Sequence, residues 1–395
     1  MKIAVIGAKG LPAGQGGIEH YCEELYPRIV AEGNSVDLFA RSSYIKKRWF
    51  SISFYKGVRV ICLPSLAVRG LDAFSNSAIA AIVASIINYD VVHFHALGPA
   101  LFSFLPRYFS SAKIVVTCQG LDWQRGKWGN LSSSVIRLGE KIAVKYAHGI
   151  IVVSKALQNY FVKTYNRNSF YIPNAPGVYP NSDPCLDSIK SFGLSQGKYL
   201  LFLGRLVPEK RPDLLIEAFQ KLKLKGWKLV LAGGNSDTSK YISKLVELSN
   251  GNSKIVFAGE LRGNRLAEIV RGAGLFVLPS DLEGLPLAML EAMREGIPVV
   301  ASDIPPHKQL VGSDRGILFN SGDINCCAKA LEKAIDQPSQ LATMASKAQK
   351  HIQTNYNWGR VTSDDLGIYN QNFELVSQEK ITESKKEIGL QTLEK

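Results

Sequence analysis

A chain of 395 residues is long enough for two or three domains, each with its own hydrophobic core. Hydrophobic residues make up 46% of the sequence and charged residues 21%, which excludes a wholly disordered chain. The net charge is +13, and the six cysteines include no CxxC pair, which favours a reduced, cytoplasmic protein over a disulfide framework or a zinc site.

The N-terminus, MKIAVIGAKG, predicts a first strand, because its apolar run is too short for a secretory signal. The longest apolar run of the first half, residues 78–87, is too short to cross about 30 Å of hydrocarbon. We therefore expect a protein of the cytoplasm without a membrane span.

The first half alternates short runs rich in Val, Ile and Leu with helical patterns. Strands are predicted at 3–6, 36–40, 58–63, 91–94, 114–118, 150–153 and 170–172. Helices are predicted at 18–32, 132–147 and 155–165, the first of them bent at Pro27. Strands that are apolar on both faces and separated by helices indicate a parallel sheet covered on both sides.

A turn-rich stretch over residues 173–197 interrupts this pattern and is typical of an interdomain linker. The alternation then restarts. Strands are predicted at 199–203, 229–232, 255–257, 275–278 and 298–301, and helices at 212–223, 241–248, 265–271 and 286–294. The simplest architecture is two doubly wound Rossmann-like domains facing across a cleft, the first over residues 1–180 and the second over 181–355. We expect a charged, frayed tail at 377–395.

The charge is concentrated in the first half. Residues 1–180 hold 20 Lys and Arg against 9 Asp and Glu, whereas residues 181–395 hold 27 against 25. A basic half predicts an anionic partner, and nucleic acid is disfavoured because no nucleic-acid-binding motif accompanies the charge. Residues 44–55 (YIKKRWFSISFY) mix basic and aromatic side chains, which favours an anionic membrane surface over a merely solubilising one.

A glycine-rich loop, GAKGLPAGQGG, follows the first predicted strand at residues 7–17. Glycines allow backbone N–H groups to approach a phosphate closely, and the following helix favours negative charge there. The loop does not match the dinucleotide fingerprint GxGxxG, because Lys9 and Pro12 occupy two of the glycine positions. We interpret it as a phosphate site rather than a merely flexible loop, and a nicotinamide-dependent dehydrogenase is disfavoured.

Two charged motifs follow strands of the second half. Arg205 and Lys210 lie in GRLVPEK, where open sheets bind ligands, although a charge pair with Glu209 at a helix start explains them equally well. Glu283 precedes the helix predicted at 286–294, and Glu291 lies inside that helix. A spacing of about two turns predicts that one face presents both carboxylates to the cleft, where they suit vicinal hydroxyls of a sugar or ribose.

Together these motifs, followed by GIPVV, resemble glycosyltransferase family 4, which has the GT-B fold. The resemblance covers roughly residues 2–369. Residues 10–19 (GLPAGQGGIE) and 118–128 (CQGLDWQRGKW) further resemble a bacterial rhamnosyltransferase-like subgroup. Asn357 and Trp358 resemble the start of a terminal helix, over residues 356–376, that crosses back to the first domain.

The resemblance implies retaining transfer from a nucleotide-diphospho-sugar to an acceptor hydroxyl, without a metal or another cofactor. By motif position, the donor diphosphate is bound by Arg205 and Lys210, the ribose by Glu291 and the donor sugar by Glu283. Further donor contacts come from the loop at Gly16 and Gly17 and from the amides near Gly284 and Leu285. Because ribose hydroxyls bind a carboxylate well, a ribonucleotide donor is favoured over deoxythymidine, and UDP is chosen on family frequency.

One position departs from the family, since Gln119 stands where many members carry a histidine near the reacting centre. Glutamine cannot act as a general base, so Gln119 can only orient a hydroxyl, and Asp122 is the nearest ionisable substitute. His93 and His95 are expected on opposite faces of one strand, with His95 on the acceptor side. Asp122 is therefore assigned a catalytic role, with Gln119 and His95 beside the acceptor.

We expect a saccharide or lipid-linked saccharide acceptor in bacterial cell-surface polysaccharide biosynthesis, and a peripheral position on the inner face of the cell membrane. Two alternatives remain open from the sequence. A GT-B sugar-nucleotide epimerase or hydrolase would convert the donor without an acceptor, and a non-catalytic protein would only bind the nucleotide-sugar.

Overall fold

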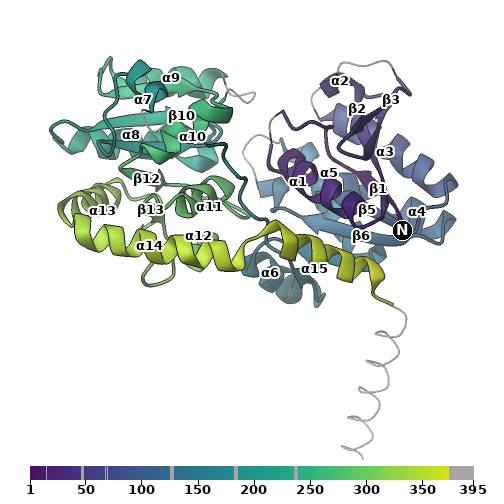
Figure 1. Ribbon diagram of the computed structural model, residues 1–395. Coiled ribbons are helices and arrows are strands. Elements are labelled where there is room, and N and C mark those ends of the chain that lie inside the picture. The colour runs from purple at the N-terminus through teal and green to yellow at the C-terminus, as the bar shows by residue number, and fades with distance from the viewer. Residues whose placement is uncertain are drawn as a thin grey trace, which may run out of the picture.

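The computed structural model describes residues 1–14, 16–45, 49–66, 68, 70–124, 129–181, 186–234 and 239–372. They form two α/β lobes, each built on one sheet covered by helices, and a C-terminal helical arm that runs along both lobes (Figure 1). The predicted pair of doubly wound domains is confirmed.

The N-terminal lobe holds an eight-stranded sheet in the order β3-β4-β2-β1-β5-β6-β7-β8. Its elements are β1 (Lys2–Ile6), α1 (Gly17–Ala31), β2 (Ser35–Arg41), α2 (Ser42–Ile45), β3 (Ile52–Tyr55), β4 (Val58–Leu63), α3 (Leu71–Ile86), β5 (Val91–His95), η1 (Pro99–Phe102), α4 (Phe104–Phe109), β6 (Lys113–Cys118), η2 (Asp122–Gln124), α5 (Asn130–Tyr146), β7 (Gly149–Val152), α6 (Lys155–Tyr165) and β8 (Phe170–Tyr171). The strand order reverses between β1 and β5, which is where open sheets bind ligands.

The C-terminal lobe holds a six-stranded parallel sheet in the order β11-β10-β9-β12-β13-β14. Its elements are α7 (Asp187–Ser191), β9 (Tyr199–Leu203), η3 (Pro208–Lys210), α8 (Pro212–Lys221), β10 (Lys228–Ala232), α9 (Ser239–Ser249), β11 (Ile255–Gly259), α10 (Gly263–Arg271), β12 (Leu275–Leu278), α11 (Leu287–Arg294), β13 (Val299–Ser302), α12 (Pro305–Val311), β14 (Ile317–Phe319) and α13 (Ile324–Asp336). The arm consists of α14 (Pro338–Asn355) and α15 (Trp358–Asn370). Here the order reverses between β9 and β12.

The predicted strands lie within a residue or two of observed ones, but two strands were not expected. The first sheet is parallel as predicted except at one edge, where the unexpected strand β3 pairs antiparallel with β4 through a turn at Lys56 and Gly57. β14 is too short to stand out in the sequence. Pro27 lies inside α1 without interrupting it. None of the described helices combines the length and apolarity that a bilayer crossing needs.

Helix α15 packs on α1 through buried polar groups. Tyr21 Oη donates a hydrogen bond to Asp365 Oδ2 at 2.9 Å, and Tyr369 Oη lies 2.6 Å from His93 Nδ1. Lys113 Nζ donates to the main-chain oxygen of Tyr369 at 2.8 Å. A helix that follows the C-terminal lobe is thereby attached to the N-terminal lobe (Figure 1).

Residues two apart in a strand share a face, and His93 and His95 accordingly lie on the same face of β5. The prediction that they lie on opposite faces is wrong. Tyr26 Oη lies 3.1 Å from His93 Nδ1 and 2.6 Å from His95 Nε2. Burial lowers the pKa of both imidazoles, that of His95 to about 3, so both are neutral. His95 is fully buried, and its assignment to the acceptor side stays a prediction.

Asp365 makes the attachment of α15 sensitive to pH. Burial raises the pKa of its carboxyl to about 7, whereas an unfolded carboxyl titrates near pH 4. Between these values the unfolded chain releases a proton that the native chain keeps, so wild-type stability falls as the pH rises through this window. Asp365→Asn cannot ionise and keeps an oxygen for Tyr21. We expect its free energy of unfolding, relative to wild type, to be up to about 4 kcal/mol higher at pH 8 than at pH 4.

Urea denaturation at the two pH values measures this difference. Asp364→Asn, on the same helix but 41% exposed, is the matched control, and its free energy of unfolding relative to wild type should differ little between the two pH values. An Asp365→Asn advantage that does not grow with pH would contradict the burial of an ionisable carboxyl between α15 and α1.

Candidate functional site

The glycine loop after β1 lies where α1 begins, facing the C-terminal lobe. Gly16 has a φ of 116°, and a Cβ there would lie 2.1 Å from Glu19 Oε2. Glu19 is buried and accepts the Lys9 backbone N–H at 3.0 Å, which fixes the loop on α1. A Cβ on Gly17 would lie 3.5 Å from the side chain of Leu287 in α11. The loop therefore lies at the junction between the lobes.

The loop after β9 carries the two cations. Arg205 is half-buried. The Lys210 side chain folds back over Gly204, and a Cβ on this glycine would lie 3.2 Å from Lys210 Cδ. Lys210 Nζ donates to Glu283 Oε1 at 2.5 Å, and the Lys210 and Glu283 side chains are 15% and 12% exposed. For Lys210, the partner is Glu283 rather than the Glu209 of the sequence alternative.

Glu283 is held as a carboxylate. Burial by itself raises the pKa of this carboxyl, but the Lys210 ammonium and the Ser280 hydroxyl outweigh it and hold the pKa below its usual value. Ser280 Oγ donates to Oε1 at 2.9 Å, the same oxygen that Lys210 contacts. No hydrogen bond from the described residues reaches Oε2, so this oxygen can accept from a ligand.

Glu291 has a different environment. It lies in α11, and Tyr179 Oη donates to its Oε2 at 2.7 Å. Burial raises the pKa of Glu291, although Tyr179, His20 and the Gly177 N–H oppose the rise. The helix spacing predicted that Glu283 and Glu291 face the cleft together. In the structure they have separate partners: Lys210 and Ser280 contact Glu283, and the 177–179 segment contacts Glu291.

The N-terminal lobe contributes the loop after β6. A Cβ on Gly284 would lie 1.9 Å from the main-chain oxygen of Gln119, so the two lobes touch backbone to backbone here. Gln119 Oε1 accepts from Asn174 Nδ2 at 2.8 Å. Asp122 begins η2 and is half-buried. Leu285, beside Gly284, is buried.

Sequence reasoning missed four residues of this junction. Asn174 and Tyr179 fall in the stretch predicted to be a linker, and His20 and Ser280 carried no motif of their own. Their partners are far away in the sequence, so only the folded chain reveals them. The subgroup-like stretch 118–128 lies in part outside the described residues, since 125–128 are not described.

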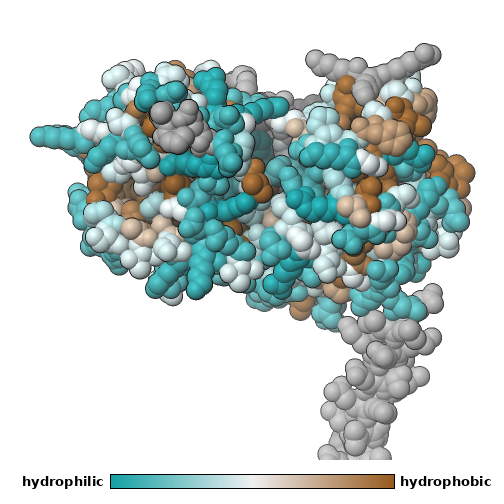
Figure 2. All heavy atoms as spheres, in the orientation of Figure 1, coloured by the Kyte–Doolittle hydropathy of each residue, from teal (hydrophilic) through white to brown (hydrophobic). Residues whose placement is uncertain are grey.

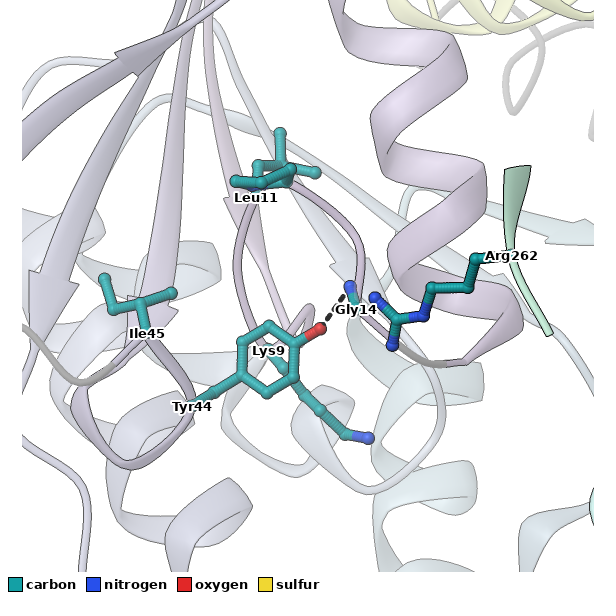
Figure 3. A pocket seen from close by; sticks show the side chains of 7 residues that line it. Lys9, Leu11, Gly14, Tyr44, Ile45 and Arg262 are labelled. Carbon is teal, nitrogen blue, oxygen red and sulfur yellow. Dashed lines mark hydrogen bonds between the residues drawn. The ribbon is translucent and has the colours of Figure 1, made fainter. Parts of the chain in front are cut away.

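A cavity of about 600 Å³ opens beside the glycine loop (Figure 3). It is lined by Lys9, Leu11, Pro12, Gly14, Tyr44, Ile45 and Arg262. Tyr44 Oη accepts the Gly14 N–H, and Lys9 Nζ lies 5.8 Å from the Tyr44 ring centroid. Arg262 belongs to the C-terminal lobe, and its Nη2 forms an ion pair with Glu260 Oε1 at 2.5 Å. The cavity thus combines apolar walls with cations from both lobes.

Comparison with known proteins shows similarity to glycosyltransferases. The family model "Glycosyltransferase Family 4" matches residues 15–175, and "Glycosyl transferases group 1" matches residues 187–351. D-inositol 3-phosphate glycosyltransferase of Gordonia bronchialis is 25% identical over 94% of this chain and 88% of its own length. Sucrose-phosphate synthase from Thermosynechococcus elongatus has a TM-score of 0.80 at 21% identity, covering 95% of this chain and 99% of its own. HepE of Anabaena in complex with UDP has a TM-score of 0.75 at 19% identity, covering 93% and 99%. At 21% and 19% identity, these two structural similarities establish the fold but not the function.

Gly284→Ala tests the backbone contact between the lobes. Its Cβ cannot coexist with the Gln119 oxygen at 1.9 Å, so the lobes must separate or the loop must distort. We expect a loss of about 1–3 kcal/mol in unfolding free energy and a larger radius of gyration by small-angle scattering. Gly367→Ala, in α15 with nothing within 4 Å of its Cβ, is the control. Equal behaviour of the two variants would rule out a tight junction at Gly284.

Proposed function

The chain belongs to glycosyltransferase family 4, and on that premise we propose that it transfers a sugar from a uridine-diphospho-sugar to a hydroxyl of a lipid-linked saccharide. The observation that carries the proposal is the group of polar residues at the strand reversal of the C-terminal lobe. Arg205 and Lys210 follow β9, and Glu283 follows β12, the neighbouring strand. Ligands of open α/β sheets bind at this point.

Breaking the anomeric C–O bond transfers negative charge to the departing diphosphate. Lys210 Nζ has three donors and uses one on Glu283, so two remain for phosphate oxygens. The Arg205 guanidinium offers a planar fork to the same group. Fixed cations aimed at developing charge are usually the largest catalytic effect, and we propose that they act here without a metal ion.

The two carboxylates bind the two sugars of the donor. Glu283 Oε2 is available to hydroxyls of the transferred sugar, next to the cations that hold the diphosphate. Glu291 lies further along α11 and is assigned to the ribose, which favours UDP over a deoxyribonucleotide. The glycine loop at Gly16 and Gly17 covers the phosphates from the other lobe and, with Asp122 and Gln119, borders the acceptor. Retention of anomeric configuration is part of the proposal on family grounds.

The acceptor is proposed to be lipid-linked because the cavity in Figure 3 combines cations with apolar walls. A lipid phosphate or diphosphate carrying a saccharide has both characters. Lys9 and Arg262 would contact its anionic part, and Leu11, Tyr44 and Ile45 its apolar part. With such an acceptor, we propose a role in bacterial cell-surface polysaccharide synthesis at the inner face of the membrane.

The surface of the N-terminal lobe supports a peripheral position on the membrane. Figure 2 has hydrophobic surface at the outer side of this lobe, where Figure 1 places β3, α3 and α4. The exposed large apolar side chains there include Trp49, Phe50, Ile52, Phe54, Leu71, Phe74, Ile82, Ile86, Tyr108 and Phe109. The first 180 residues also carry the excess of basic charge. The basic residues of the 44–55 segment, 46–48, lie outside the described residues.

Arg205→Ala and Lys210→Ala test the donor site. Each should keep the fold and lower sugar transfer by about 10²–10³, because a preorganised cation is lost from the departing diphosphate. The assay incubates labelled nucleotide-sugars with a membrane extract and counts label in lipid and in water. Lys308→Ala, an exposed lysine of the same lobe, is the control. Near-normal transfer in both variants would refute the donor site, and label released only into water would favour a hydrolase or epimerase.

Sedimentation with phosphatidylglycerol vesicles tests the membrane surface. We expect binding at about 0.1 M salt and release at about 1 M, where charges are screened within about 3 Å. Replacing both Phe54 and Phe109, each 71% exposed, by serine should weaken binding by at least about tenfold. Val246→Ser removes an exposed apolar side chain of the other lobe and should bind as wild type. Absence of binding at low salt would point to an acceptor in solution.

A further inference from the structure

Two amide side chains meet at the junction between the lobes. Gln119 follows β6 and Asn174 follows β8, so both lie at the carboxyl ends of strands in the N-terminal sheet. Asn174 Nδ2 donates to Gln119 Oε1 at 2.8 Å, and Asn174 is only 2% exposed. The turn-rich segment that joins the lobes therefore contributes a buried polar group to the site.

Each amide keeps one buried atom without a partner. Gln119 Nε2 and Asn174 Oδ1 have no hydrogen-bond partner in the described part of the chain. If both amides were rotated, their mutual hydrogen bond would persist and one nitrogen and one oxygen would still be unpaired. A buried donor and a buried acceptor left unpaired are costly to the fold, unless a ligand or an ordered water satisfies them.

The amide pair adjoins the donor site. The main-chain oxygen of Gln119 is the atom that a Cβ on Gly284 would meet at 1.9 Å, and Gly284 directly follows Glu283. On the other side, a Cβ on Gly177, three residues after Asn174, would lie 3.5 Å from Glu291 Oε1. The pair is thus connected through short stretches of chain to both carboxylates assigned to the donor.

We propose that Gln119 and Asn174 bind a single sugar hydroxyl, with Gln119 Nε2 donating a hydrogen bond to its oxygen and Asn174 Oδ1 accepting a hydrogen bond from its O–H. A hydroxyl donates and accepts at once, whereas an ionised phosphate oxygen only accepts and an ammonium only donates. The inference rests on the proposed function and adds a specificity determinant to it. The hydroxyl belongs to the transferred sugar or to the acceptor, and proximity to the Glu283 loop favours the transferred sugar.

Gln119→Glu tests the subsite with little change in shape. The glutamate keeps an oxygen for Asn174 Nδ2 but replaces the unpaired donor by a second oxygen. We expect kcat/KM for the active uridine-diphospho-sugar to fall about 10- to 100-fold, while the Kd of UDP itself stays within about twofold. Gln353→Glu, an exposed amide on α14, is the control and should behave as wild type. If the melting temperature of Gln119→Glu is well below that of wild type, Gln119→Met takes its place in the test, because it removes the donor without adding a charge.

Deoxygenated donor analogues identify the source of the hydroxyl. If the hydroxyl belongs to the donor, wild type loses activity with the donor analogue that lacks this hydroxyl. The Gln119→Glu variant then has the same activity with that analogue as with the complete donor. For an acceptor hydroxyl, the variant instead raises the KM for acceptor, and donor analogues affect both proteins equally. Wild-type kcat/KM in the variant, or a parallel loss of UDP binding, overturns the subsite. Failure of wild type to bind UDP would instead refute the donor assignment itself.

Discussion

The close approach of main chain from the two lobes at Gly284 is the constraint on which the rest of the site depends. The Gln119 oxygen occupies the space that a Cβ on Gly284 would need, so no other residue allows this distance. A second, looser contact lies where a Cβ on Gly17 would be 3.5 Å from the side chain of Leu287 in α11. Because the lobes meet at both points, the loops after β1, β6, β9 and β12 border one space rather than two separate surfaces. Residues from both lobes can therefore act on one ligand.

Polar groups at this junction are arranged for position rather than for stability. A buried ion pair such as Lys210–Glu283 contributes little to folding, since the cost of desolvating both charges offsets their attraction. The pair instead fixes where each side chain lies. The polar cluster between α15 and the first lobe acts similarly: buried tyrosines and neutral histidines attach α15 to the first lobe at defined points. Such a cluster limits how the lobes can shift against each other.

The fold was largely predictable from the sequence, because strands buried on both faces produce continuous runs of Val, Ile and Leu. The edge strand β3 was missed for the opposite reason: Ile52 and Phe54 face solvent, so they do not mark a core. The histidine pair was misplaced by a wrong use of strand alternation rather than by lack of signal. Arg205, Lys210 and Glu283 could be singled out because each follows a recognisable strand.

The remaining site residues could not be found in this way. Asn174 lies 55 residues from Gln119, and Tyr179 lies 112 residues from Glu291. Proline and glycine around them indicate only that the chain turns. On the proposed mechanism, this segment has a second consequence. The segment that joins the lobes also donates to Glu291 and pairs with Gln119, so any change in the angle between the lobes moves groups assigned to the ribose and to a sugar hydroxyl. Donor binding and lobe closure are then coupled by covalent connection, without a separate relay between them.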